Sequence, residues 1–134
     1  MAEKKSIINI LTTVESNNNP KAVSKKGAIG LAQIKAKKGA LDDWNKYHPK
    51  EQYTREDLFN PKINLKIAKW YLTERIPQML RYYKIPDTWR NRFWAYNDGI
   101  GRVVKGIMHT ETKNYLSKIE KLLKEAGYGL DLRH

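Results

Sequence analysis

Apolar side chains recur three or four positions apart through most of the chain, which is the spacing of one face of an α-helix. The first such run, residues 7–14, ends at a polar loop that contains a proline, residues 17–20. Residues 28–38 predict a short helix that ends at Gly39, and residues 42–56 predict a loop with one helical turn. No segment alternates between apolar and polar residues as a strand does, so the pattern predicts a mainly α fold.

The second half of the chain predicts one long buried helix with further helices after it. Asn60 and Pro61 mark a helix start, because an Asn side chain caps a helix and proline fits its first turn. The residues that follow are apolar on most sides, and Pro77 is expected to kink or split this helix. Asp87 is expected to cap the next helix, which ends near Gly99. The remaining predicted boundaries are residues 101–107 for a short helix, then Thr110 or Thr112 at the start and Gly127 at the end of the last helix.

The charge balance is strongly basic, since 26 Lys and Arg residues against 14 Asp and Glu residues give a formal net charge of +12. Such a charge indicates an acidic partner, which could be nucleic acid, an anionic membrane surface or a bacterial cell wall. The chain has no cysteine and only three widely separated histidines, so we expect neither disulfides nor a metal site. No apolar run reaches the roughly 20 residues of a transmembrane helix, and the first residues lack the apolar centre of a signal peptide.

Glu15 is the only acidic residue between Lys4 and Lys38. It follows Ile8 by seven positions and Leu11 by four, so it lies on the apolar stripe of the first helix. Burial there would raise the pKa of its carboxyl group and keep a proton available near neutral pH. Position alone leaves two interpretations open, a carboxylate that ends a helix in water and a catalytic acid.

Four short motifs follow one another along the chain. They are Glu15-Ser16, Gly30-Leu31-Ala32-Gln33, Ala95-Tyr96-Asn97 and Glu111-Thr112-Lys113-Asn114-Tyr115. In this order and spacing, over about residues 8–119, the chain resembles the soluble lytic transglycosylase domain, a family related to goose-type lysozymes. One departure is Ala32, which stands where that family usually has methionine.

The resemblance implies a mainly α, lysozyme-like single domain, residues 1–134, with a groove that binds the glycan strands of peptidoglycan. Glu15 matches the single catalytic glutamate of the family. The residues that match its substrate-binding positions are Ser24, Gln33, Tyr96, Asn97 and Tyr115. The resemblance implies no metal and no other cofactor.

The implied chemistry needs one acid only. Glycoside hydrolysis normally uses two carboxyl groups, but a single one is sufficient if the substrate supplies the nucleophile. Glu15 would protonate the oxygen between N-acetylmuramic acid and N-acetylglucosamine, then remove the proton of the muramoyl C6 hydroxyl, which closes a 1,6-anhydro ring. The alternative is a muramidase in which Asp98 or another acid positions a water molecule. Two further alternatives are a small basic protein that binds nucleic acid and a wall-binding domain without catalysis.

The expected partners are peptidoglycan glycan strands and the anionic wall surface, with no nucleic acid, and the expected oligomeric state is a monomer. We expect the protein to act on the bacterial wall, in the periplasm or outside the cell. The apparent lack of a signal peptide suits a phage endolysin released from the host cytoplasm or a domain excised from a larger enzyme. The sequence leaves open the host, the type of wall and whether cleavage is endo or exo.

Overall fold

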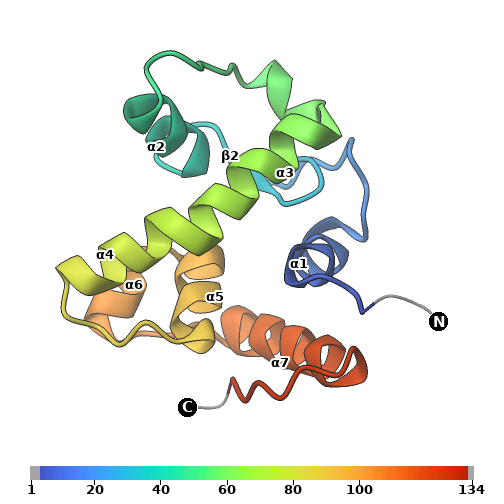
Figure 1. Ribbon diagram of the computed structural model, residues 1–134, viewed down its shortest axis with the longest axis vertical. Coiled ribbons are helices and arrows are strands. Elements are labelled where there is room, and N and C mark those ends of the chain that lie inside the picture. The colour runs from blue at the N-terminus through green and yellow to red at the C-terminus, as the bar shows by residue number, and fades with distance from the viewer. Residues whose placement is uncertain (1–3, 133–134) are drawn as a thin grey trace. The chain divides into compact units, whose positions relative to one another are not determined.

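The computed structural model describes residues 4–132, and most of them are helical, as the sequence pattern predicts (Figure 1). The chain divides into two compact units, one of residues 11–71 and the other of residues 1–10 with residues 72–134. We refer to them as the 11–71 unit and the C-terminal unit. Helix α1, Ile7–Ser16, contains the first point of division, and the second follows Tyr71.

The 11–71 unit combines helices with a short antiparallel hairpin. After α1 its elements are β1 (Ala28–Ile29), β2 (Ile34–Lys35), α2 (Ala40–Tyr47), the 3-10 helix η1 (Glu56–Phe59) and α3 (Pro61–Trp70). The hairpin occupies the segment for which the pattern predicts a helix, so the prediction for residues 28–38 is wrong.

Left-handed backbone conformations explain why this segment is not helical. Gly30 has φ +78° and Gln33 has φ +51°, and both lie in the turn between the strands. An α-helix of L-residues cannot contain such conformations. Ile29 and Ile34 face each other across the hairpin and are buried, but strands of two residues are too short to show an alternating pattern in the sequence.

Helix α2 begins directly after Gly39, so this glycine precedes a helix and does not end one. The loop predicted for residues 42–56 is therefore wrong in its first part. The ring of Trp44, which is buried, stacks on the ring of His48 one turn later, with centroids 3.6 Å apart. Aromatic packing at this i, i+4 spacing favours a helix in a segment whose many charges predict a loop.

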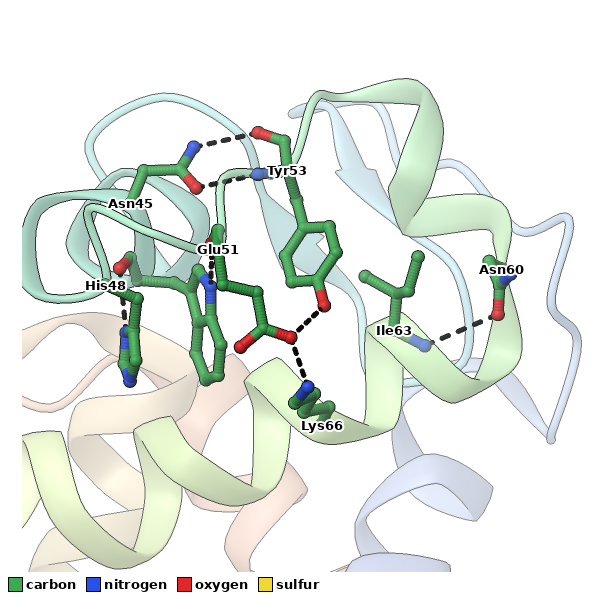
Figure 2. Close-up of polar contacts among 8 residues, drawn as sticks. Asn45, His48, Glu51, Tyr53, Asn60, Ile63 and Lys66 are labelled. Atoms are coloured by element: carbon green, nitrogen blue, oxygen red, sulfur yellow. Dashed lines mark hydrogen bonds and ion pairs between the residues drawn. The ribbon is translucent and has the colours of Figure 1, made fainter.

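The loop after α2 is fixed by polar contacts to α2 and α3 (Figure 2). The side chain of Asn45 donates to the backbone oxygen of Tyr53 at 2.8 Å and accepts from its N–H at 2.9 Å. The Glu51 carboxylate accepts from the Tyr53 hydroxyl at 2.5 Å and pairs with Lys66 of α3. The bond from Lys66 is the main cause of a lowered pKa at Glu51. The bond to Glu51 is the main cause of a raised pKa at Tyr53 and at Lys66.

Helix α3 starts where the sequence predicts. The Asn60 side-chain oxygen accepts from the backbone N–H groups of two first-turn residues, at 2.9 and 3.4 Å. The helical run is not broken at Pro77, and a kink there stays a prediction. The type of helix does change just before the proline, because a π-helical turn, η2 (Tyr71–Arg75), precedes α4 (Ile76–Tyr82). Proline has no N–H to bond to the carbonyl four residues earlier, and the regular hydrogen-bond pattern changes just before it.

In the C-terminal unit, helix α5 lies at the centre of the helix packing. The helices after η2 are α4, α5 (Trp89–Asp98), α6 (Ile100–Lys105) and α7 (Thr110–Glu125). Helix α5 contacts each of the other three (Figure 1). Phe93 of α5 and Ile119 and Leu123 of α7 are fully buried. The predicted short helix after Gly99 is confirmed, and Gly127, at φ +90°, ends α7 as expected.

The predicted cap of α5 is wrong by one residue. Thr88 precedes the helix, and its hydroxyl oxygen accepts from the N–H of Asn91 at 3.1 Å. Asp87 instead binds Arg92 through two bonds, at 2.6 and 3.0 Å. This pairing holds the pKa of the Asp87 carboxyl group below its usual value. The Asp87 carboxylate therefore binds the Arg92 side chain and does not cap the helix.

The cap predictions for α7 are also wrong. His109 precedes the helix and makes no capping bond with its side chain, while Thr110 occupies the first helical position. Thr112 is only 2% exposed, and its hydroxyl binds a side chain of α5, described below. None of the helices within residues 4–132 combines the length and hydrophobicity that a membrane span requires.

Candidate active site

Glu15 occupies the last turn of α1 in the 11–71 unit and is partly buried. The helix ends at Ser16, one residue later, because Asn17 and Asn18 adopt left-handed conformations at φ 54° and 59°. The hydroxyl of Ser16 donates to the backbone oxygen of Leu31 at 2.7 Å. The residue next to Glu15 is therefore bonded directly to the turn that carries the Gly30–Gln33 motif.

Gln33 shapes this turn with its own side chain. Its amide nitrogen donates to the backbone oxygens of Gly30 at 3.0 Å and Ala22 at 3.3 Å. Two carbonyl acceptors fix which end of the amide is nitrogen. Its side-chain oxygen makes no hydrogen bond within residues 4–132 and remains available to accept one from a ligand.

Asn64 of α3 holds the same turn from inside. It is fully buried, and its amide nitrogen donates to the backbone oxygens of Ile29 and Leu58, each at 2.9 Å. Its side-chain oxygen accepts from the N–H of Ala32 at 2.9 Å. At Gly30 an added Cβ would lie 2.5 Å from this amide nitrogen, so only glycine allows the close approach.

Asn64 has no role in the predictions from the sequence, although its position carries a signal. Asn64 precedes Ile67 by three positions and Ala68 by four, so it lies on the buried stripe of α3. A polar residue on such a stripe needs hydrogen-bond partners inside the protein. Those partners belong to a turn that was itself predicted as a helix, and they could not be identified beforehand.

Ser24 closes a second turn of the 11–71 unit. Its hydroxyl oxygen accepts from the N–H of Ala28 at 3.0 Å, and its own N–H donates to the oxygen of Ala28 at 2.9 Å. Val23, beside it, pairs with Ile29 as an isolated bridge. The hydroxyl proton of Ser24 is not used in these contacts and can be donated to a ligand.

In the C-terminal unit, Asn97 is oriented by a buried threonine. The Thr112 hydroxyl of α7 donates to the side-chain oxygen of Asn97, in the last turn of α5, at 2.8 Å. The amide nitrogen of Asn97 is left without a partner among the described residues, so it can donate to a ligand. Tyr96 is partly buried beside it, and Tyr115 of α7 is 6% exposed.

Asp98 is engaged within the C-terminal unit. Its side chain is 10% exposed and pairs with the Nδ1 atom of His109 at 3.0 Å. It also accepts from the indole N–H of Trp94 at 3.3 Å. A carboxylate held by two side chains at a largely buried position is poorly suited to position an attacking water molecule.

The candidate residues therefore fall into two groups. Glu15, Ser24 and Gln33 belong to the 11–71 unit, where hydrogen bonds connect the segments that carry them. Tyr96, Asn97 and Tyr115 belong to the C-terminal unit. That the two groups form one site stays a prediction. Within residues 4–132, no three His, Cys, Asp or Glu residues group closely enough to hold a metal ion.

Comparison with known proteins agrees with the motifs. The family model of the transglycosylase SLT domain matches residues 2–119. Similar proteins include the endo-type membrane-bound lytic murein transglycosylases A of Salmonella paratyphi B, Salmonella enteritidis and Salmonella typhimurium. Each is 27% identical over 125 residues, which cover 87% of this chain and 57% of the relative. The mainly α structure agrees with the lysozyme-like fold of this family. The chain belongs to the transglycosylase SLT domain family.

Proposed function

We propose that the chain, residues 1–134, is one catalytic domain that cleaves the β-1,4 bond between N-acetylmuramic acid and N-acetylglucosamine in peptidoglycan. The observation that carries the proposal is the direct bond from Ser16, next to Glu15, to the turn of the Gly30–Gln33 motif. Two of the four motifs are thereby joined next to Glu15, the acid to which the resemblance assigns catalysis. The names of the Salmonella relatives support the same reaction class.

In the proposed mechanism Glu15 serves first as acid and then as base. Its protonated carboxyl group donates to the glycosidic oxygen, and the bond to C1 of the muramoyl residue breaks. The 2-acetamido oxygen of the substrate stabilises the positive charge that develops at C1. The Glu15 carboxylate then takes the proton of the C6 hydroxyl as that oxygen attacks C1. A 1,6-anhydro ring forms, no water is consumed, and Glu15 ends protonated as it began.

The other residues would position the sugar by the donors and acceptors that the protein leaves unused. Ser24 would donate through its hydroxyl, Gln33 would accept through its side-chain oxygen, and Asn97 would donate through its amide nitrogen. We propose that Tyr96 and Tyr115 also contact the glycan strand.

The muramidase alternative is less well supported. It needs a second group to position water, and Asp98, the acid nearest to the Tyr96-Asn97 motif in the sequence, is held by His109 and Trp94. Products distinguish the reactions, because a muramidase leaves reducing ends and the proposed reaction leaves anhydro ends.

The proposed setting is the bacterial wall, reached in the periplasm or from outside the cell, with the protein acting as a monomer. The net charge of +12 would concentrate it on an anionic wall surface. Release from a phage-infected host cytoplasm and origin as a part of a larger wall enzyme are both compatible with this proposal.

The decisive experiment replaces Glu15 and follows the products by mass spectrometry. Glu15→Gln should abolish release of anhydro-muramoyl fragments from purified peptidoglycan and leave the unfolding temperature close to that of the wild type. Glu125→Gln, at the exposed end of α7, is the matched control and should retain full activity. Wild-type rates in Glu15→Gln would rule out Glu15 as the acid, and reducing ends from the wild type would favour the muramidase.

A further inference from the structure

Five lysines of the 11–71 unit gather beside the hairpin. We refer to Lys25, Lys26, Lys35, Lys37 and Lys38 as the hairpin lysines. All five are exposed, and the sequence contains no acidic residue from position 16 to position 41. Positive charge is therefore concentrated in this segment, whereas the same net charge could have been spread evenly along the chain.

The first two of these lysines lie in a tight turn. The backbone N–H of Gly27 donates to the oxygen of Ser24 at 3.0 Å, and two bonds between Ser24 and Ala28 close the turn. Lys25 and Lys26 occupy the tip of this turn, and their side chains are exposed to solvent.

The other three lysines lie in a second turn next to the first. Lys35 of β2 is the register partner of Ala28, and paired strands lie about 5 Å apart. The chain then folds back, since an added Cβ at Gly39 would lie 2.8 Å from the Cβ of Lys35. Lys37 and Lys38 occupy the tip of this second turn, and Lys38 adopts φ 53°. The hairpin register therefore brings the two lysine-bearing turns together at one end.

None of the hairpin lysines forms an ion pair within residues 4–132. Asp42 accepts a hydrogen bond from the backbone N–H of Lys38 at 2.7 Å. Like charges within a Debye length, about 8 Å at physiological salt, repel one another, so a bound polyanion would stabilise this surface.

We propose that the hairpin lysines bind a flexible phosphate-rich polymer of the bacterial wall and hold the protein on it. The inference rests on the proposed function and adds a second contact with the wall. Ammonium groups on long flexible stems suit phosphate as point charges without fixed geometry. Residues 21–39 contain no aromatic side chain, whereas sites for single-stranded nucleic acid combine positive charge with rings on which bases stack.

The hairpin lysines and the Gln33 turn lie at opposite ends of the hairpin. The Gln33 turn lies at the end of the hairpin opposite to the pairing of Ala28 with Lys35. A polymer bound to the hairpin lysines would therefore leave the proposed contacts of Gln33 open to a glycan strand. The expected result is longer residence on walls that carry phosphate polymers and no change in the bond that is cleaved.

The test compares a variant with all five hairpin lysines replaced by Gln with a control of equal charge. The control carries Lys→Gln at five exposed lysines of the C-terminal unit that form no ion pair, namely Lys5, Lys84, Lys105, Lys118 and Lys121. Binding is measured by sedimentation with sacculi that retain their phosphate polymers and with sacculi stripped of them by hydrofluoric acid. Circular dichroism melting establishes that both variants are folded.

The hairpin variant should bind unstripped sacculi at least tenfold more weakly than the control. For single-stranded nucleic acid the logarithmic salt slope is about −0.7 per neutralised phosphate. Five lysines would thus contribute a slope of up to about −3.5. Equal weakening by both variants, or equal binding to both kinds of sacculi, would overturn the inference. Wild-type binding to duplex DNA as tight as to unstripped sacculi would also overturn it. Cleavage of stripped sacculi by the wild type is measured separately. If the wild type did not cleave them, that result would count against the proposed function and not against the inference about the hairpin lysines.

Discussion

Asn64 offers the most direct test of how the fold holds the Gly30–Gln33 motif. Asn64→Asp keeps the acceptor for Ala32 and removes both donors, so the introduced carboxyl group faces two carbonyl oxygens at 2.9 Å. Each lost bond is worth about 0.5–1.5 kcal/mol, and a buried acceptor left without a donor costs about 1–3 kcal/mol. We expect a loss of about 2–5 kcal/mol, against a typical total stability of about 5–15 kcal/mol.

The loss should depend on pH in a defined direction. Burial next to two carbonyl oxygens favours the neutral form of the introduced carboxyl group, so its folded-state pKa lies above the unfolded value of about 3.9. Stability relative to the wild type should then fall by about 1.4 kcal/mol for each pH unit above about 4, until the folded-state pKa is passed. Urea unfolding followed by circular dichroism at several pH values from 4 to 7 measures this.

A matched control is Asn114→Asp, at an exposed position of α7. It adds the same charge without removing a buried donor, so its stability should remain within about 0.5 kcal/mol of the wild type. If Asn64→Asp were as stable as this control at pH 7, the assignment of Asn64 as the internal support of the turn would be refuted.

The remaining predictions concern other contacts. Thr112→Val removes the bond that orients Asn97 and should lower the unfolding temperature by about 3–5 °C and reduce glycan cleavage. Thr112→Ser keeps the hydroxyl group and should restore cleavage, and a Ser variant as inactive as Val would exclude this role. Glu51→Gln should lower the unfolding temperature by about 1–2 °C at pH 7. The lowered pKa of Glu51 means that its stabilising effect is present above the unfolded value of 4.5 and is lost as pH falls through the folded value. The difference from wild type should therefore shrink as the pH falls below 4.5, and a constant difference would contradict the assignment to Lys66 and Tyr53.

Local signals in the sequence were sufficient for the helical class and for several boundaries. The start of α3 at Asn60 follows from a side chain and a backbone within the same turn, so no distant contact can change it. The cap of α5 was harder, because Asp87 and Thr88 are both good capping residues. The choice between them depends on Arg92, whose guanidinium group takes the Asp87 carboxylate.

The hairpin and the support of the candidate site depend on contacts between distant segments. Asn64 is separated by 35 positions from Ile29 and by 32 from Ala32, and nothing in the local pattern pairs them. The role of Thr112 also depends on a distant contact. Its position in the sequence suggests a helix cap, but its hydroxyl donates to the side chain of Asn97 on α5. Glu15 could be proposed as the acid through the family motifs alone, because its helical position suits a structural carboxylate equally well.

The hydrogen bonds that the Gln33 amide nitrogen makes within the protein have a consequence for inhibitor design. Because the nitrogen is bound to two backbone oxygens, the Gln33 side chain presents its oxygen, an acceptor, to a ligand. A sugar analogue whose acetamido N–H is replaced by an ester oxygen would place two acceptors against each other there. Asn97 presents the reverse polarity, because its oxygen is bound to Thr112. A ligand group that contacts Gln33 must therefore offer a donor, and a ligand group that contacts Asn97 must offer an acceptor.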